Sequence, residues 1–555
     1  MTYSGDPEMA HRPREFVLLV QTVPPPTRGW GATISVNVLI APLIRVTANE
    51  VVGTQTLPGV LAALVRDAVS GFPALRAHQR HAWHSFLVLL AANALHRAGR
   101  AEPPDTEDAW RDLLRGLTPD DPDDFAWSLI APPARPALLQ PPIPSGELSD
   151  LRNEIVTPDG LDMLVTSRNH DLKQAVMAAP RPDDWLFALV TLQTMEGFLG
   201  AGNYGISRMN GGFANRAALG IAPRGGAGAH FLRDLRLVLA LRGKTGAVGY
   251  AAEGGLALVW LAPWDGTASL RRDALDEWFI EICRRVRLTQ RDGRLVARAD
   301  TSKVPRIVPV EGGVTGDPWS PVVIEKDGGA KSLTVDARGF GYRRMVDLMF
   351  QGGGVRPAPL QTPDPMDDAE GLHLIARALV RGQGKTEGYH ERRVGLSRRV
   401  RRGPTERATD PAAEAARERV RLAGVVQDQA LKPALLALFQ NGPDKIDFRD
   451  KDSTRKAEVF LKRFDAAVDR TFFDDLWRET EHDDPDARIG ERGVWVRTLL
   501  AHAKALLDDA GSAAARASRR RYRASVRAAD RLSAAARFNE HLKPFHPEAA
   551  AHDPG

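Results

Sequence analysis

Apolar residues recur at steps of three and four after position 408, and this spacing constrains that part of the chain to amphipathic helices. The clearest stripe consists of Phe460, Phe464, Val468 and Phe472. The spacing predicts helices over 411–440, 453–478, 487–510 and 512–542. Asp410 and Pro411 are expected to start the first helix, and Pro433 to kink it. Helices with short loops and one apolar stripe each predict a four-helix bundle.

The chain before position 403 mixes helical and strand patterns with loops rich in glycine and proline. Helical patterns start at Leu57 and after Pro73, and another covers Asp273–Val286. Strands are predicted over Phe16–Val20, Thr33–Leu39, Leu256–Leu261, Val304–Val310, Val322–Glu325 and Ser332–Val335. A chain of 555 residues is too long for one core. We therefore expect an α+β protein, with a large mixed α/β N-terminal domain over 1–403 and the C-terminal four-helix bundle over 408–545.

Composition narrows the class of protein further. The chain has 75 basic and 70 acidic residues, a net charge of +5 and one cysteine, Cys283. A single cysteine excludes an intramolecular disulfide and a thiolate-rich zinc site, and it fits a reducing compartment. We identify no apolar leader and no apolar run long enough to cross a membrane. We expect a cytoplasmic protein with no membrane partner, no cofactor and no bound metal.

The stretch from Gly197 to Arg216 reads GFLGAGNYGISRMNGGFANR and follows neither a helical nor a strand period. Its glycines permit positive φ angles and a close approach of the backbone to another molecule. Polar and aromatic side chains between them are expected to face outward, toward a polyanion. They are Asn203, Tyr204, Arg208, Asn210, Asn215 and Arg216. A long turn between two core elements explains the same pattern, so both interpretations stay open on this stretch alone.

Two more polar stretches have the same character. A dense cluster that follows an apolar element contains Arg168, Asn169, His170 and Lys173, side chains that suit contacts with base edges. The other stretch, Leu379–Arg393, contains Gln383 and the triplet Gly384-Lys385-Thr386. Three separated loops of this kind favour a nucleic-acid-binding protein over an enzyme.

Basic residues concentrate just before the predicted domain boundary and on the last helix. The first group comprises Arg392, Arg393, Arg398, Arg399, Arg401 and Arg402. The last helix carries Arg520, Arg523 and Arg527 among other arginines. A nucleic-acid backbone or a partner protein would fit these surfaces, and a solvated helix face explains the last one equally simply.

Enzyme hypotheses rest on weaker patterns. A Walker A loop requires a glycine five residues before its second glycine, but this chain has Leu379 there, in a segment with a helix-like pattern. His170 and Asp171 are candidates for a general base and its orienting group, yet adjacent residues rarely face each other. His78, His81 and His84 lack an acidic neighbour in sequence, which favours buried or surface histidines over metal ligands. A nucleotide hydrolase and an RNA- or protein-binding scaffold stay as alternatives.

Several short motifs follow one another in a fixed order. They are Leu57-Pro-Gly-Val-Leu-Ala-Ala-Leu, Phe72-Pro-Ala-Leu-Arg with the following His-Gln-Arg-His-Ala-Trp-His, Leu138-Leu-Gln-Pro, the Ser167–Lys173 cluster, Asn210-Gly-Gly-Phe, Asp317-Pro-Trp-Ser-Pro and Gly382–Arg393. In this order, and followed by a helical bundle, they resemble the CasA family, the large subunit of the type I-E CRISPR surveillance complex Cascade. The resemblance covers nearly the whole chain, although no single motif in it is highly specific.

The resemblance implies a subunit that performs no chemistry itself. Such a subunit recognises the protospacer-adjacent motif (PAM) in double-stranded DNA, helps the guide RNA (crRNA) to open the duplex, and docks a helicase–nuclease. Its partners are therefore crRNA, target DNA, the other Cascade subunits and that helicase–nuclease.

The resemblance also implies roles for individual residues. The cluster around Asn169 matches the loop that touches the PAM and the 5′ handle of the guide. Gly211, Gly212 and Phe213, followed by Ala214, Asn215 and Arg216, match the glycine loop at the PAM minor groove. The family has a lysine where this chain has Ala214, so Asn215 or Arg216 would supply the donor. The glutamine wedge that splits the duplex falls at Gln383, and Lys385 shares that role because the spacing to Glu391-Arg392-Arg393 is longer than in better-known members.

Overall fold

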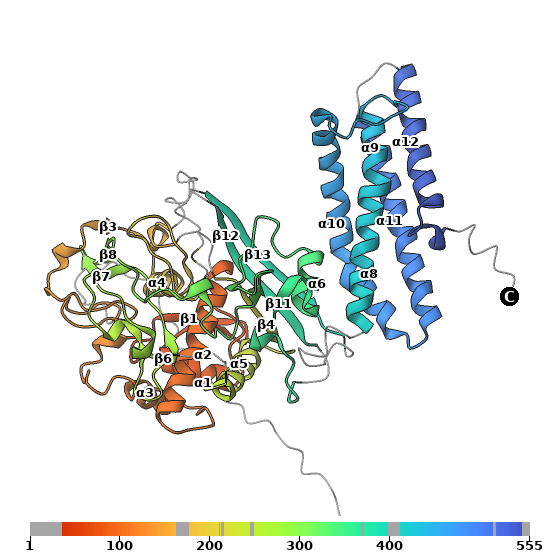
Figure 1. Ribbon diagram of the computed structural model, residues 1–555. Coiled ribbons are helices and arrows are strands. Elements are labelled where there is room, and N and C mark those ends of the chain that lie inside the picture. Colours follow the sequence, from red (N-terminus) through yellow and green to blue (C-terminus); the bar gives the residue numbers. More distant parts are fainter. Residues whose placement is uncertain are drawn as a thin grey trace, which may run out of the picture.

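The computed structural model describes residues 36–162, 177–209, 211, 216–244, 249–367, 371–382, 385–397, 411–513 and 518–546, without the side chains of 381–382, 385–387, 513 and 518–521. A part with mixed helices and small sheets lies beside a bundle of long helices (Figure 1). Two long strands, β12 (His373–Gly382) and β13 (Lys385–Gly395), run between them (Figure 1). The predicted α+β class, with a mixed N-terminal part and a helical C-terminal bundle, is confirmed. The predicted domain boundary, 403–408, lies outside the described residues.

Helix α2 (Arg80–Arg97) forms the centre of the first core. Its side chains are buried on almost every side, because α3, α4 and α5 all pack against it. The neighbouring α1 (Leu57–Val65) begins where the sequence predicts, with Pro58 in the first turn and the Thr56 hydroxyl accepting from the amide of Gly59 at 2.9 Å. The remaining N-terminal helices are α3 (Glu107–Arg115), α4 (Pro182–Met195) and α5 (Ala227–Leu241).

The strands of the N-terminal part form several small sheets. They pair as β1 (Ile44–Ala48) with β2 (Val51–Gln55), β3 (Asn153–Ile155) with β8 (Arg294–Asp300) and β7 (Arg285–Arg291), β5 (Leu256–Leu258) with β6 (Leu275–Ile280), and β10 (Ala330–Ser332) with β9 (Val322–Ile324) and β11 (Val355–Arg356). A tight turn joins β9 to β10, in which the amide of Glu325 bonds the carbonyl of Gly329 at 2.7 Å.

The sheet of β4 (Ala218–Ala222), β12 and β13 matters most for the predicted sites. β12 and β13 form an antiparallel hairpin that pairs from His373–Gly395 to Gly382–Lys385. The prediction of a helix-like pattern before Gly384 is therefore wrong. Alternate residues of β12 enter the second core, as a strand requires: Leu374, Ala376, Ala378 and Val380.

Three other local predictions also fail, in whole or in part. The predicted helix Asp273–Val286 is strand β6 followed by the start of β7. Trp278, Phe279 and Ile280 are all buried, and such a continuous apolar run fits a strand covered on both faces as well as it fits a helix. No strand covers Val304–Val310, which contributes only an isolated bridge between Ile307 and Leu270. The predicted strand Thr33–Leu39, described from Val36 onward, gives only a bridge at Asn37, and Phe16–Val20 lies outside the described residues.

The C-terminal bundle follows the predicted helices closely. Its elements are α8 (Pro411–Val425), a π-helical turn (Val426–Leu431), α9 (Lys432–Phe439), α10 (Lys451–Glu481), α11 (Pro485–Ala513) and α12 (Ser518–Phe538). The π-helical turn lies just before Pro433, whose ring cannot fit a regular helical hydrogen-bond pattern. Among the helices of the described residues, none has the length and apolar character needed to span a membrane.

The bundle packs on the sheet through helix α6 (Tyr342–Phe350) and through β13. The amide of Tyr342 bonds Asp469 at 2.6 Å, and its hydroxyl bonds Asp465 at 3.1 Å. Arg392 on β13 forms an ion pair with the same Asp469 and bonds its carbonyl at 2.8 Å. The second core is continuous across this junction, so the hairpin is held by both parts of the protein.

Candidate nucleic-acid interface

The described part of the glycine-rich stretch closes on itself at the end of α4. The amide of Leu199 bonds the carbonyl of Asn203 at 2.9 Å, and that of Ile206 bonds Glu196 at 3.0 Å. The amide of Arg216 bonds the carbonyl of Met195 at 3.0 Å. Both ends of the stretch therefore meet at one place. The segment between them includes the predicted contact residues Asn210, Gly212, Phe213, Ala214 and Asn215, which lie outside the described residues.

Two glycines of this stretch are required by its own packing. A Cβ at Gly205 would stand 2.6 Å from the carbonyl carbon of Gly197, so the two backbones could not approach as they do. Gly202 has φ +80, and a Cβ there would also meet Thr301 at 2.6 Å. The glycines thus serve the fold of the loop base, while Gly211, with φ +84 and open space around it, lies next to the predicted contact segment.

Both arginines of this stretch face the interior, not outward as the sequence suggested. Arg208 is 3% exposed, bonds the carbonyl of Phe279 at 2.6 Å and lies over that ring. Arg216 is 2% exposed and bonds both carboxylate oxygens of Asp317. In this conformation the Arg216 guanidinium is committed to Asp317, so it anchors the loop base instead of offering a donor to DNA.

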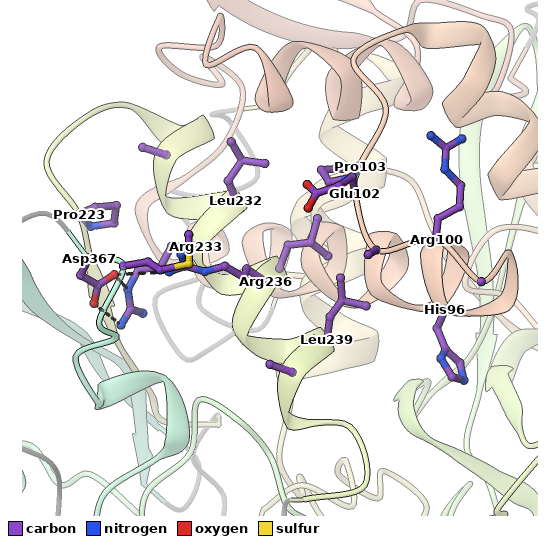
Figure 2. A pocket seen from close by; sticks show the side chains of 16 residues that line it. His96, Arg100, Glu102, Pro103, Pro223, Leu232, Arg233, Arg236, Leu239 and Asp367 are labelled. Carbon is purple, nitrogen blue, oxygen red and sulfur yellow. Dashed lines mark hydrogen bonds and ion pairs between the residues drawn. The ribbon is translucent and has the colours of Figure 1, made fainter.

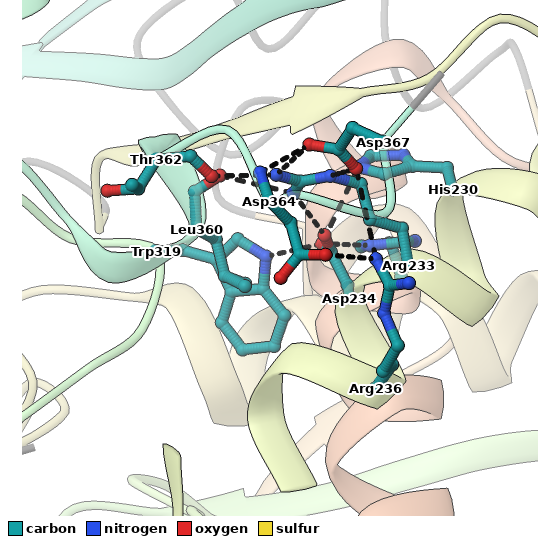
Figure 3. Close-up of polar contacts among 10 residues, drawn as sticks. His230, Arg233, Asp234, Arg236, Trp319, Leu360, Thr362, Asp364 and Asp367 are labelled. Carbon is teal, nitrogen blue, oxygen red and sulfur yellow. Dashed lines mark hydrogen bonds and ion pairs between the residues drawn. The ribbon is translucent and has the colours of Figure 1, made fainter. Parts of the chain in front are cut away.

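A chain of buried polar contacts runs from Arg216 toward α2 and α5. The Arg216 guanidinium lies 5.4 Å from the centre of the Trp319 ring. The indole nitrogen of Trp319 donates to Asp234 on α5 at 3.0 Å (Figure 3). Asp234 in turn bonds Nε2 of His84 on α2 at 2.9 Å. The anchor of the glycine loop is therefore connected to α2 by direct contacts.

The group His84, His230 and Asp234 is the candidate for a metal site among the described residues, because its ligand atoms all lie within 4.8 Å of one another. The two imidazoles stack at 4.1 Å with 21° between their planes, so one ion cannot lie in the planes of both rings. Asp234 is also bonded by Trp319 and lies 3.4 Å from Arg233 (Figure 3). Burial lowers the pKa of His230 to about 3, which keeps this ring neutral. We therefore interpret the group as a hydrogen-bonded cluster that joins α2 to α5.

The predicted base-reading cluster, Arg168, Asn169, His170 and Lys173, lies outside the described residues, but its N-terminal base is described. Asp162 bonds Nε2 of His78 at 2.8 Å and Arg76 at 3.1 Å. Arg76 also pairs with Asp159. The last described residue before position 163 is therefore a carboxylate fixed by the residues that lead into α2.

The base of the β12–β13 hairpin meets the same part of the chain. The His78 ring lies 6.5 Å from that of Tyr389 on β13. The Tyr389 hydroxyl donates to Glu391 at 2.7 Å, and Arg377 on β12 pairs with Glu391 at 3.0 Å. We call residues Arg76–His84 the histidine segment. It contacts the base of segment 163–176 and the hairpin directly, and the base of the glycine loop through Trp319 and Asp234.

One buried carboxyl under the glycine loop has a strongly shifted pKa. Burial raises the pKa of Glu281 to about 7, against the opposing effect of the nearby Arg208. The Glu281 carboxylate accepts from the amide of Ser207 in the loop base. The charge of this carboxyl therefore changes near neutral pH, next to the loop.

Two larger cavities lie on different faces of α5. One, of about 900 Å³, lies between α5 and the turn after α2 (Figure 2). Two arginines in its lining are compensated, since Arg233 pairs with Asp367 at 2.7 Å and Arg236 with Asp364 at 3.0 Å (Figures 2 and 3). The other, of about 560 Å³, lies against the histidine segment and the hairpin sheet.

The solved structures that this chain resembles share one architecture. No protein-family model and no curated protein matches the sequence. Among solved structures, "CRISPR-associated protein Cse1" from Acidimicrobium ferrooxidans superposes with a TM-score of 0.62 at 14% identity, over 93% of this chain and 100% of that one. "Thermus thermophilus CasA (Cse1)" gives 0.55 at 16%, over 90% and 99%. A chain of a "CRISPR RNA-guided surveillance complex" gives 0.56 at 15%, also over 90% and 99%.

The chain has the CasA (Cse1) fold. Within this fold, the predicted contact residues in and after the hairpin differ in how far they are described and paired. Gln383 lies outside the described residues, and Lys385 begins β13 with an undescribed side chain. Arg392 is paired with Asp469, whereas Arg393 is exposed. Arg398 and Arg399 also lie outside the described residues.

The arginines of α12 are divided in the same way. Arg527 pairs with Asp444 and bonds the carbonyl of Gly442 at 3.1 Å, so it holds the turn after α9. Arg523 is exposed, and the side chain of Arg520 is not described. A nucleic-acid role for the α12 surface stays a prediction.

Sequence reasoning missed the residues that organise this CasA-like site. Arg76, His78 and Trp319 stood inside the motifs that carry the resemblance, but their partners are distant in sequence. The three histidines were the available signal. The acidic partners of His78 and His84, Asp162 and Asp234, lie 84 and 150 positions further along the chain.

Proposed function

We propose that this chain is the large subunit of a type I-E, crRNA-guided surveillance complex. In this role it recognises the PAM in double-stranded DNA, helps to start R-loop formation and recruits a helicase–nuclease, without catalysing a reaction itself. The observation that carries the proposal is that described residues at the bases of the three predicted contact stretches meet at one histidine segment, in a chain that has the CasA fold over nine tenths of its length.

A shared base suits a reader of short DNA motifs. Loops fixed to one buried segment keep their relative positions when DNA binds, so little ordering cost is added on binding. The minor groove offers few distinguishing groups, which suits a reader built from small residues and a few donors, as at Gly211–Asn215. In RNA-guided systems base pairing reads the target, and the protein reads only the flanking motif.

The hairpin suits a strand-separating role. Gln383 stands in the sequence between the two strands, which pair as far as Gly382 and Lys385. The base of the hairpin is fixed by Arg377–Glu391 on one face and Arg392–Asp469 on the other. A wedge must overcome about 1.4 kcal/mol of stacking per base step, so it needs a rigid support. Lys385 at the start of β13 and the basic residues Arg398 and Arg399 would bind the phosphate backbone nearby.

The nucleotide-hydrolase alternative loses its structural basis. A phosphate-binding loop leads from a strand into a helix, whose amides cradle the phosphates. Here Lys385 and Thr386 begin the second strand of an antiparallel hairpin. The scaffold alternative, binding through α12 alone, gives no role to the convergent loops.

The assembled complex provides the test. We expect Gln383→Ala to slow R-loop formation on a PAM-containing duplex while leaving the initial duplex affinity nearly unchanged. Gln290→Ala, at an exposed position of β7, is the matched control. Gel shifts on duplexes with and without candidate motifs measure binding, and a base-analogue fluorophore beside the motif measures strand opening. Equal opening rates for the wild type and Gln383→Ala would contradict the wedge assignment.

A further inference from the structure

The cavity of about 560 Å³ has a lining that the proposed loops do not explain. It is formed by the histidine segment, the start of α5 and the face of β12–β13 that carries Arg377 and Arg393. Its volume lies within the range of small-molecule sites, about 300–1,000 Å³. The cavity therefore has room for a ligand the size of one nucleotide.

The charge of the lining is basic. Arg80, Arg377 and Arg393 line it, and no aspartate or glutamate does. Arg377 is compensated by Glu391 at 3.0 Å. Arg80 and Arg393 are exposed, and neither forms an ion pair with another described residue, although Arg80 acts electrostatically on Glu391. Two positive charges are thus left to attract an anion, and guanidinium groups match phosphate geometry well.

The opposite wall is apolar and aromatic. Phe72 is partly exposed and meets the buried Trp83 edge to face at 5.8 Å, and the buried Phe231 lies with them among the lining residues. His230 is neutral and adds no charge to this wall. An aromatic surface beside arginines is the combination with which proteins hold a single-stranded nucleotide, by stacking its base and neutralising its phosphate.

We propose that this cavity binds one nucleotide unit of a nucleic-acid strand, with its phosphate on Arg80 and Arg393 and its base against Phe72. The proposal rests on the proposed function, because it assigns a subsite for a strand that the hairpin has separated. Arg393 stands seven residues from Thr386, or roughly 24 Å along the strand from the tip. A nucleotide held here would keep an opened strand away from its complement.

The first test measures how single-stranded binding by the full chain depends on salt. Each phosphate contact contributes about 0.7 to the slope of log affinity against log salt for a single strand. Because both arginines would contact the same phosphate, Arg80→Gln with Arg393→Gln should reduce the slope by about 0.7 for a 20-nucleotide DNA, measured by fluorescence anisotropy. The double Lys variant should keep most of the slope, and Arg294→Gln, exposed on β8, should keep all of it. An unchanged slope in the double Gln variant would overturn the phosphate assignment.

A second readout locates the base. An oligonucleotide with iodinated uracils, crosslinked by light and mapped by mass spectrometry, should give adducts on Phe72 that the double Gln variant lacks. Adducts only elsewhere would overturn the proposal. Binding of AMP that depends on the two arginines and is not displaced by single-stranded DNA would also overturn the proposal, because the cavity would then be a site for a free nucleotide.

The outcomes separate the cavity from the wider function. If the salt slope and the adducts behave as expected but the complex shows no PAM preference, the proposed function fails and the subsite stands. If PAM-dependent R-loops form while slope and adducts are unaffected by the arginine variants, the subsite fails and the function stands.

Discussion

Breaking the buried pair of Arg216 and Asp317 should disable the glycine loop while leaving the bundle intact. Both side chains are at most 5% exposed, and the guanidinium bonds both carboxylate oxygens. Asp317→Asn leaves the Arg216 charge buried without a counter-ion, which costs about 3–5 kcal/mol in comparable pairs. For a large domain this lowers the unfolding temperature by roughly 5–10 °C. The loop base should open locally before the domain unfolds, because the two ends of the loop are joined at Arg216.

Hydrogen exchange and DNA binding measure this effect together. In Asp317→Asn, amides of 197–209 should exchange faster, whereas those of α10 should not, and PAM-dependent binding should fall more than non-specific binding. The double variant Arg216→Met with Asp317→Leu removes both charges and should recover most of the lost stability. Unchanged exchange over 197–209 in Asp317→Asn, with normal PAM preference, would refute the anchoring role of the pair.

Three further predictions concern other parts of the chain. Burial raises the pKa of Glu281 from 4.5 to about 7, so the contribution of this carboxyl to the free energy of unfolding is present below pH 4.5 and is lost as the pH rises through 7. This loss is on the order of 3 kcal/mol, and the dependence of stability on pH should be flatter in Glu281→Gln. Parallel profiles of unfolding free energy against pH for the two proteins, between pH 5 and 8, would contradict this. In the bundle, the buried Glu479 carboxylate pairs with Arg419, at 2.6 Å, and with Arg492. Glu479→Gln should therefore lower the free energy of unfolding, measured by chemical denaturation, by about 3–5 kcal/mol. The exposed control Asp508→Asn should leave it unchanged. Lys385→Ala should leave ATP hydrolysis at the background rate of the wild type, and turnover that disappears in this variant would favour the nucleotide hydrolase.

The bundle could be predicted because its signal is local. Phe464, Val468 and Phe472 stand one helical turn apart in sequence and are all buried in the structure. Strand β12 could not be recognised as easily, because Ala376, Ala378 and Leu379 are good helix formers and only the pairing with β13 overrides that preference. Local propensity decides an element only where tertiary pairing does not oppose it.

The site was partly predictable for a similar reason. The stretch Gly197–Arg216 was recognisable as a loop from its glycines alone. The fate of its arginines was not, because Arg216 finds Asp317 at 101 positions away, and no local pattern reports such a pair. His84 likewise finds its carboxylate on another helix. Sequence thus predicted the loop character of the described part of Gly197–Arg216, whereas most of the stretch Leu379–Arg393 belongs to strands β12 and β13.

Isolation of the full-length chain from its native cells tests the central claim most directly. The account predicts that it co-purifies with further protein subunits and a short RNA, and that sequencing of this RNA gives spacer segments flanked by one repeat sequence. The isolated particle should then open a duplex that carries both a matching target and the PAM. Recovery of the chain without RNA and without partners, or with RNA unrelated to any repeat array, would contradict the account.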